Sequence, residues 1–278
     1  MSEDVLFDKR DDGVGLITLN RPDSLNAMGG DLIPMLGRYL EECERSRDVR
    51  CVAVTGTGRA FCAGGDVKGM VAGQRGGGDG GDSGERPSFA QMLEETVRGL
   101  CHGQDNVSLR LHTMGKPTVA LVNGPAAGAG MSVALAADIR FCSDKATFVP
   151  AFAKVGLSGD FGGSYLLPKL VGFGKARELY FLSETIDAAR ALELGIANHV
   201  VPHDEFVEKG LGYCARLAKG PTAVYSRMKA NFTLGESVGF AEALDQEAMN
   251  MRLSGMAKDF REGTRAFVEK RDPKFTGE

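Results

Sequence analysis

The sequence predicts an α/β fold made of wound turns of similar shape, followed by a helical C-terminal region. Short apolar runs are typical of buried strands, and helical periodicity separates them. A strand, strand, helix order recurs about every 45 to 60 residues. From about residue 162 onward the pattern is mainly helical. We therefore predict a core over residues 1–200 and a helical region over residues 201–278.

Each element follows from its local pattern. Asp11-Asp12-Gly13 is a turn signal between two β-prone runs, which predicts a hairpin. The later strands are apolar runs that end at glycine or asparagine turns. The expected strands are 5–9, 14–20, 49–55, 118–122, 139–142 and 146–149, and the expected helices are about 30–46, 88–114, 131–137, 164–170, 237–254 and 256–270. Seven glycines among residues 73–84 predict a mobile segment.

The composition excludes several classes of function. A net charge of −4 does not favour a nucleic-acid partner. The N-terminus is acidic and has no apolar run, so we expect no signal peptide. The sequence has no run of about 18 apolar residues, so we expect no membrane span and no membrane partner. Six cysteines without zinc or redox spacing are expected to be reduced thiols in a cytoplasmic protein. Pro202 separates His199 from His203 and argues against a helical metal site, so no metal is expected.

Two glycine-rich turns lead from strands toward helices, at residues 61–66 and 123–130. Glycine allows backbone amides to approach a ligand, and a helix N-terminus adds unpaired N–H groups. Two such turns facing one another would bind an oxygen that becomes negative. Each turn taken alone is also compatible with a tight turn and nothing more.

Asp160 stands among glycines and apolar residues just before the helix expected at residues 164–170. One interpretation is a helix N-cap, a position that aspartate favours. The other is a partly buried carboxylate with a raised pKa, suited to proton transfer. The spacing alone leaves both open.

Other catalytic motifs are weaker. The turn at 123–130 does not have the spacing of a dinucleotide fingerprint, and residues 172–176 lack the Ser or Thr of a P-loop. Ser132 has no G-x-S-x-G around it and no histidine placed as its base. It is expected to be a small helical residue.

Four segments in order resemble the crotonase family, also called the enoyl-CoA hydratase/isomerase family. They are Arg21-Pro22 with Leu25 to Met28, Phe61 to Lys68, Asn123 to Asp138, and Glu262 to Pro273. The resemblance implies a spiral of ββα turns, a C-terminal trimerisation region and a homotrimer or hexamer. It also implies an acyl-CoA thioester substrate without metal or redox cofactor.

The resemblance places oxyanion donors at the amides of Ala63 and Ala129. It implies substrate contacts at Ala27, Ala63, Gly64, Gly65, Asp66, Ala129, Phe152 and Lys270, the last reaching the CoA phosphates.

The departures from the family pattern favour one reaction. Two glutamates that activate water in typical hydratases are matched here by Ser132 and Phe152, neither of which is a carboxylate. Asp160 matches the aspartate of some isomerases and of 4-chlorobenzoyl-CoA dehalogenases. We therefore expect a double-bond shift in an enoyl-CoA, with Asp160 as the proton shuttle. The alternatives are a hydratase or dehalogenase/hydrolase acting on an acyl-CoA, and an inactive acyl-CoA-binding protein.

Overall fold

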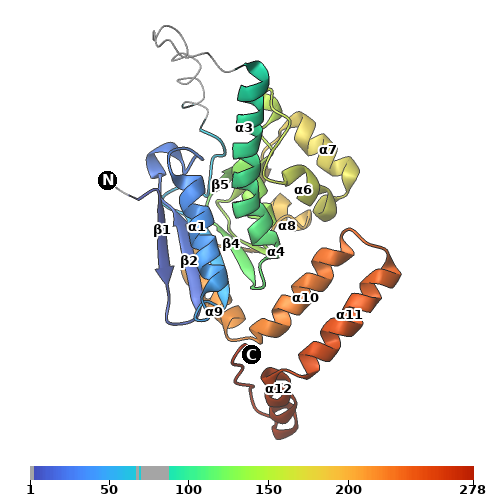
Figure 1. Cartoon of the computed structure of the whole chain (residues 1–278). Helices are drawn as coiled ribbons and strands as arrows, with labels where there is room; N and C mark the ends of the chain where they lie inside the picture. Colours follow the sequence, from blue (N-terminus) through green and yellow to red (C-terminus); the bar gives the residue numbers. More distant parts are fainter. Residues whose placement is uncertain (1–2, 67–68, 70–87) are drawn as a thin grey trace.

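The computed structural model describes residues 3–66, 69 and 88–278, and it contains two sheets (Figure 1). The predicted mobile segment 73–84 lies outside these residues. The larger sheet has the order β1-β2-β3-β4-β6-β9. Its strands are β1 (Val5–Lys9), β2 (Val14–Leu19), β3 (Cys51–Gly56), β4 (Thr118–Val122), β6 (Ile139–Ser143) and β9 (His199–Val201). Only the β1–β2 pair within this sheet is antiparallel, and it forms the predicted hairpin.

The smaller sheet stands beside the larger one and has the order β5-β7-β8. Its strands are β5 (Pro125–Ala127), β7 (Thr147–Val149) and β8 (Ile186–Asp187). The predicted repeat of strand, strand and helix is therefore real, because β4 and β5, and then β6 and β7, send one strand to each sheet. The region after residue 162 is less purely helical than expected, since β8 and β9 extend the two sheets.

Helices follow the strands in the predicted order. They are α1 (Leu32–Arg45), α3 (Phe89–Gln104), α4 (Arg110–Thr113), α5 (Ala129–Ala136), α6 (Gly163–Val171), α7 (Phe173–Leu182), α8 (Ala188–Glu193), α9 (Phe206–Ala218), α10 (Thr222–Gly235), α11 (Phe240–Gly255) and α12 (Lys258–Glu269). The long helix expected at 88–114 is interrupted by a π-helical turn, Asp105–Leu109. Helix α5 begins at Ala129, two residues earlier than expected, which places the Ala129 amide in its first turn.

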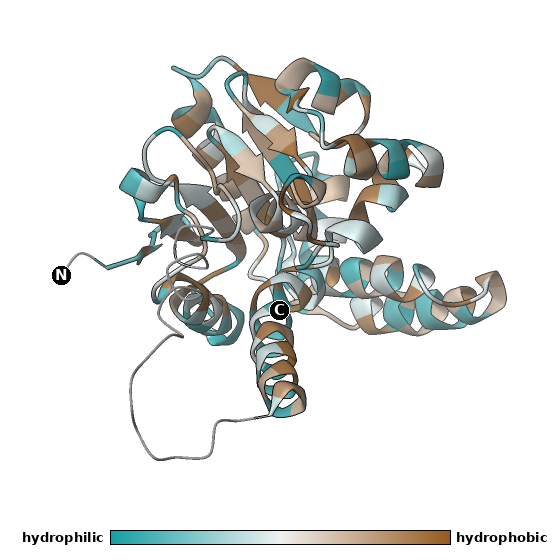
Figure 2. Cartoon of the chain, turned by 90° about the horizontal axis from the view of Figure 1, so that it is seen from above, coloured by the Kyte–Doolittle hydropathy of each residue, from teal (hydrophilic) through white to brown (hydrophobic). Residues whose placement is uncertain are grey.

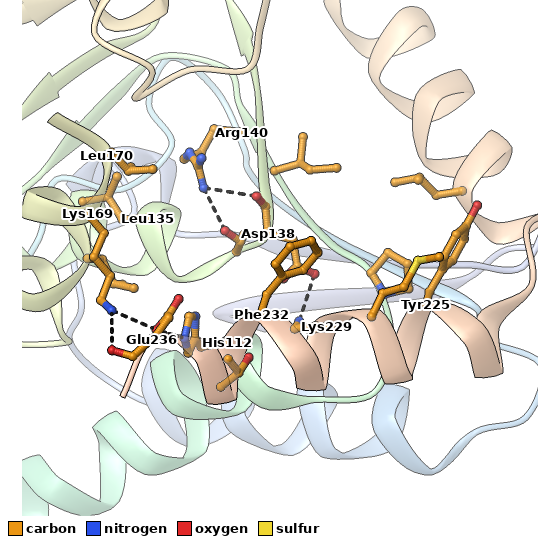
Figure 3. A pocket seen from close by; sticks show the side chains of 17 residues that line it. His112, Leu135, Asp138, Arg140, Lys169, Leu170, Tyr225, Lys229, Phe232 and Glu236 are labelled. Carbon is orange, nitrogen blue, oxygen red and sulfur yellow. Dashed lines mark hydrogen bonds and ion pairs between the residues drawn. The ribbon is translucent and has the colours of Figure 1, made fainter. Parts of the chain in front are cut away.

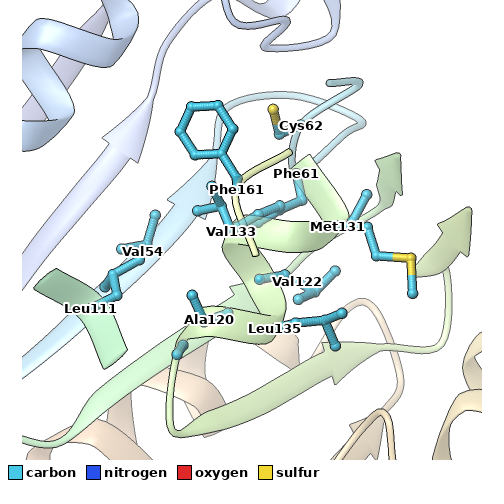
Figure 4. Close-up of a cluster of buried hydrophobic side chains, with 14 of the residues drawn as sticks. Val54, Phe61, Cys62, Leu111, Ala120, Val122, Met131, Val133, Leu135 and Phe161 are labelled. Atoms are coloured by element: carbon cyan, nitrogen blue, oxygen red, sulfur yellow. The ribbon is translucent and has the colours of Figure 1, made fainter. Parts of the chain in front are cut away.

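Helix α5 lies at the centre of the core. All eight of its residues are buried, so its sequence is small or apolar on every face. Figure 4 shows its Met131, Val133 and Leu135 in one cluster with side chains from β3 and β4. Phe61, which begins the glycine-rich turn at 61–66, and Phe161, which follows Asp160, join the same cluster. The core therefore fixes the ends of both loops.

The last three helices project from this body (Figures 1 and 2). The boundary predicted near residue 200 falls between β9 and α9, and α9 still packs on the large sheet through Phe206, Cys214 and Ala218. Beyond α10, the apolar side chains of α11 and α12 are exposed in the single chain, including Phe240 at 81% and Phe267 at 86%. Such a surface favours association with another chain. A trimer or hexamer stays a prediction.

Lys229 anchors the projecting helices to the body. Its Nζ atom donates to the Leu111 carbonyl at 2.8 Å and to Asp138 Oδ2 at 2.9 Å. Burial lowers the pKa of the Lys229 ammonium, and the charge of Asp138 counteracts this effect. The pair thus connects α10 to the turn before β6.

We predict that Lys229→Met destabilises the protein by about 2 kcal/mol, because it leaves Asp138 without its cation at a partly buried position. Urea denaturation measures the change. Lys219→Met is the matched control, since Lys219 is exposed just after α9. Equal midpoints for the two variants would contradict an anchoring role.

Candidate active site

The first glycine-rich turn is paired with the segment after β2. The Ala63 N–H donates to the Leu25 carbonyl at 3.0 Å, and the Met28 N–H donates to the Gly64 carbonyl at 2.7 Å. This corrects the assignment of Ala63 as an oxyanion donor, because its amide is already used within the protein. Sequence alone missed the point, since the partner of that amide lies almost forty residues earlier in the chain.

In the first turn, the Gly65 N–H is free to bind a ligand, whereas the Ala63 N–H is not. Met28 pairs with Gly65 in a short parallel bridge, in which the Met28 amide bonds the Gly64 carbonyl. No acceptor for the Gly65 N–H lies within the part of the chain that the structure describes. Gly64 has φ +90°, a conformation that favours glycine and turns the chain at this point. The free amide of this turn is therefore that of Gly65.

The second glycine-rich turn meets the first one backbone to backbone. Phe61 N–H donates to the Pro125 carbonyl at 3.0 Å, and Ala127 N–H donates to the Cys62 carbonyl at 2.9 Å. A Cβ added to Gly64 would lie 3.4 Å from the Ala129 nitrogen. As the first residue of α5, Ala129 has an amide without an acceptor inside its helix. Gly65 and Ala129 thus supply free N–H groups from neighbouring turns.

Arg21 and Asn26 shape the floor of the first turn. The buried Asn26 amide group donates to the Ala60 carbonyl at 2.8 Å and to the Thr57 carbonyl at 3.0 Å. Arg21 donates to the Ala27 carbonyl at 2.7 Å and lies 3.4 Å from an Asp66 carboxylate oxygen. Arg21 therefore connects the predicted substrate contacts Ala27 and Asp66, and the Met28 bridge holds Gly64 and Gly65 next to them.

Asp160 does not cap a helix. Helix α6 has Gly162 as its N-cap and no side-chain cap hydrogen bond, so the N-cap interpretation is wrong. The Oδ1 atom of Asp160 is buried and has no hydrogen-bond partner among residues 3–66, 69 and 88–278. Burial raises the pKa of this carboxyl group. A carboxylate oxygen that is buried without a hydrogen-bond partner is costly to keep for stability alone, which favours a functional role.

The loop that carries Asp160 is held by glycines and by Gln104. Gly159 and Gly162 adopt positive φ angles of 122° and 83°, and Phe161 adopts 51°. The Phe161 N–H donates to the Gln104 side-chain oxygen at 3.0 Å, which connects the loop to the end of α3. A β-branched residue at these positions would be strained.

Ser132, Phe152 and Tyr180 form a wall beside this loop. Phe152 is 6% exposed, and its ring stacks on Tyr180 with centroids 6.1 Å apart. Phe152 also approaches the Cβ positions of Gly128, at 3.7 Å, and Gly159, at 3.8 Å. It therefore lies between the second glycine-rich turn and the Asp160 loop, and its contact with a substrate stays a prediction.

Tyr180 is the residue that sequence reasoning missed. Burial raises the pKa of Tyr180 to about 12, while a hydrogen bond with Ser132 lowers it and the nearby Asp160 charge raises it. The phenol is therefore neutral at physiological pH. Nothing in the sequence singled it out, because it lies in the last turn of α7, twenty residues after Asp160 and outside any motif.

Lys270 is not brought to these residues in the single chain. It ends α12 in a left-handed conformation, with φ 54°, and is exposed. Figure 1 shows α12 at the lower end of α11, near the start of α10 and away from α6 and α7. Contact between Lys270 and the CoA phosphates stays a prediction.

A cavity of about 480 Å³ lies elsewhere, between α10 and the body (Figure 3). Its charged groups satisfy one another: Glu236 contacts His112 at 3.1 Å and Lys169 at 3.4 Å, and Lys229 pairs with Asp138. None of the predicted catalytic residues lines it. We regard it as part of the joint between α10 and the body.

Other chemistry is not indicated in the described part of the chain. All six cysteines are free thiols, and burial raises the pKa of Cys62, within the first turn, to about 12. No cluster of three or more potential metal ligands is found among the described residues. No helix in those residues is both long and apolar enough to cross a membrane.

Comparison with known proteins decides the family. The family model described as enoyl-CoA hydratase/isomerase matches residues 9–278. The chain belongs to the enoyl-CoA hydratase/isomerase family. It is 35% identical to the 1,2-epoxyphenylacetyl-CoA isomerase of Escherichia coli over 95% of both chains. It is also 35% identical to a probable enoyl-CoA hydratase of Rhodobacter capsulatus, over 96% of this chain and 95% of the relative.

The fold comparison agrees. A crystal structure of a putative enoyl-CoA hydratase/isomerase from Mycobacterium abscessus superposes with a TM-score of 0.88 and 28% identity, covering 99% of this chain and 100% of that one. The predicted crotonase-like fold is confirmed. The chain is an acyl-CoA enzyme of the enoyl-CoA hydratase/isomerase family, whose members include both isomerases and hydratases.

We predict that Asp160→Asn raises the melting temperature at neutral pH. The folded pKa of Asp160 lies above its unfolded value, so its contribution to stability is present below about pH 4 and is lost as pH rises through the folded pKa. Asparagine does not ionise and avoids that loss. The gain should be about 2–4 °C per kcal/mol at pH 8 and should shrink toward pH 4.

Melting curves across this pH range measure the effect. Asp11→Asn, at an exposed turn, is the control and should show no comparable trend. A melting temperature of Asp160→Asn that falls relative to wild type as pH rises would contradict the desolvated site.

Proposed function

We propose that this enzyme shifts a double bond in an enoyl-CoA, with Asp160 carrying the proton between two carbons. The observation that carries the proposal is the buried, unpartnered carboxylate oxygen of Asp160, in a loop that packs against α5 through Gly163 and Ser132. Ser132 and Phe152 occupy the positions at which the resemblance expects water-activating glutamates. Asp160, in the loop beside these two residues, is thus the acid–base group of the proposed reaction.

The amides of Gly65 and Ala129 would bind the thioester oxygen. When a proton leaves the α or γ carbon, its electron pair moves onto that oxygen and forms an enolate. Two N–H groups, one of them at the positive end of α5, stabilise this charge. Removing one such donor costs on the order of 10²–10³ in rate in other enzymes.

Asp160 begins the cycle as a carboxylate. It takes the proton from one carbon, becomes a neutral acid, and returns the proton to the other carbon of the allylic system. A raised pKa makes the carboxylate a stronger base, which suits a weakly acidic carbon. Electrons and protons balance within the substrate and Asp160, so the proposed step consumes no co-reactant.

The apolar wall favours isomerisation over hydration. The rings of Phe152 and Tyr180 stack beside Asp160 and limit the space for an attacking water. Ser132 is 1% exposed and its hydroxyl donates to the Gly128 carbonyl at 3.3 Å, so it is not placed as a base. An enolate held in this surrounding would be reprotonated by Asp160.

We further propose that the enzyme works as a cytoplasmic homotrimer or hexamer. The exposed apolar side chains of α11 and α12 support this, because a single chain would leave them in water. The substrate class is an acyl-CoA thioester.

We predict that Asp160→Asn lowers the rate of 3-enoyl-CoA to 2-enoyl-CoA conversion by about 10²–10⁴, because asparagine neither accepts nor returns a proton. Chromatographic separation of the isomers measures the rate, since substrate and product have the same mass. Asp11→Asn is again the control. Near-wild-type turnover by a folded Asp160→Asn enzyme would exclude Asp160 as the shuttle.

We also predict that the wild-type enzyme hydrates crotonyl-CoA at least about 10²-fold more slowly than it isomerises its best 3-enoyl-CoA, since no second carboxylate activates water. Loss of the absorbance of the conjugated thioester reports hydration. Fast hydration would overturn the isomerase assignment and favour the hydratase alternative. Mass spectrometry for an acyl-aspartate at Asp160 distinguishes the dehalogenase alternative.

A further inference from the structure

Tyr180 touches three parts of the candidate site at once. Its Cε1 atom lies 3.5 Å from the Cβ position of Gly159, the residue before Asp160. Its hydroxyl oxygen lies so close to Gly163 that any side chain there would overlap it. The same hydroxyl group faces the Ser132 hydroxyl group of α5, since both oxygens would overlap a Cβ added to Gly163. The phenol therefore spans the Asp160 loop from one end to the other and reaches the helix behind it.

The two elements that Tyr180 joins carry the two halves of the proposed reaction. Helix α5 begins with the Ala129 amide, which would bind the enolate oxygen. The loop of residues 159–163 carries Asp160, and the Gly163 N–H closes it on the Asp160 carbonyl at 3.3 Å. Gly163 also faces Ser132, since an added Cβ would overlap the Ser132 hydroxyl oxygen. The loop thus rests on the Ser132–Tyr180 pair.

The carboxylate itself is held by little else. Asp160 Oδ1 has no hydrogen-bond partner among the described residues, and the Gln104 contact acts on the next residue's backbone. The position of the carboxylate must therefore come from the packing and hydrogen bonding of its loop. Tyr180 contributes to this packing, because its ring lies against Gly159 and its hydroxyl group against Gly163.

We propose that Tyr180 is a positioning residue: by bridging to Ser132, it holds the Asp160 loop at a fixed place relative to the Ala129 amide. This inference rests on the proposed function of Asp160. A proton removed from one carbon and returned to another requires the carboxylate to reach both while the thioester oxygen stays bound. A misplacement of about 1 Å can cost about 10²-fold in rate.

The test compares Tyr180→Phe with Tyr165→Phe in the full-length enzyme. Tyr180→Phe keeps the ring that stacks on Phe152 and removes only the hydroxyl group. We expect kcat for isomerisation to fall about 10- to 100-fold, with KM changed less than about threefold. Tyr165 lies on α6, is half-exposed, and donates its hydroxyl hydrogen bond to Glu236 after α10. Tyr165→Phe should therefore leave both constants unchanged.

Ser132→Ala removes the other half of the bridge. We expect a similar fall in kcat, and the double variant Ser132→Ala/Tyr180→Phe should be little slower than either single one, because both changes break one interaction. If Tyr180→Phe does not fold, Ser132→Ala decides the matter, since it leaves the aromatic stack in place. Fully additive losses would overturn the proposed bridge.

The outcomes separate this inference from the proposed function. If Asp160→Asn is inactive while Tyr180→Phe and Tyr165→Phe have equal kcat, the shuttle stands and the positioning role is overturned. A rise in KM alone for Tyr180→Phe also overturns it, since that result indicates substrate binding. If Asp160→Asn stays active, the proposed function itself fails.

Discussion

The close approach of two backbone turns is the constraint on which the rest of the structure depends. The Phe61 N–H donates to the Pro125 carbonyl and the Ala127 N–H donates to the Cys62 carbonyl, so the first turn lies directly against the segment that leads into α5. A side chain on Gly124 or Gly130 would overlap the carbonyl oxygens of Arg59 and Cys62. Glycine is required here because the contact is between backbones, and that contact brings the free amides of Gly65 and Ala129 to neighbouring positions.

The burial of α5 follows from this contact. A helix that begins where two turns meet has the body of the protein on every side, and all its residues are buried. Its polar N-terminus is then the one end that can serve a ligand, because the four first N–H groups lack partners within the helix. The Asp160 loop lies against the same helix through Gly163 and Ser132, so the amide donors and the carboxylate share a single support.

The sequence predicted what depends on local pattern. The strand at 118–122 was correctly placed, because an apolar run is a local signal. The segment at 123–130 does lead into α5, but it contains β5, and the helix begins at Ala129 rather than at residue 131. The sequence could not show which amide of the first turn, that of Ala63 or that of Gly65, is free to bind an oxyanion. The direction of each amide depends on pairing with Leu25 and Met28, which lie far away in the sequence. The N-cap interpretation of Asp160 also needed the observed start of α6. Tyr180 reaches the site only through the packing of α7, which leaves no motif.

The same desolvation that tunes Asp160 also limits what else the site contains. An ionised carboxylate without partners is expensive to bury, and a second one nearby would raise the cost further through like-charge repulsion. Uncharged side chains at Ser132 and Phe152 and a phenol that stays protonated at Tyr180 avoid that repulsion. A site with one carboxylate is therefore suited to moving a single proton within the substrate, whereas two carboxylates would attract and order water. The uncharged side chains of Ser132, Phe152 and Tyr180 are thus matched to the carboxylate of the loop beside them.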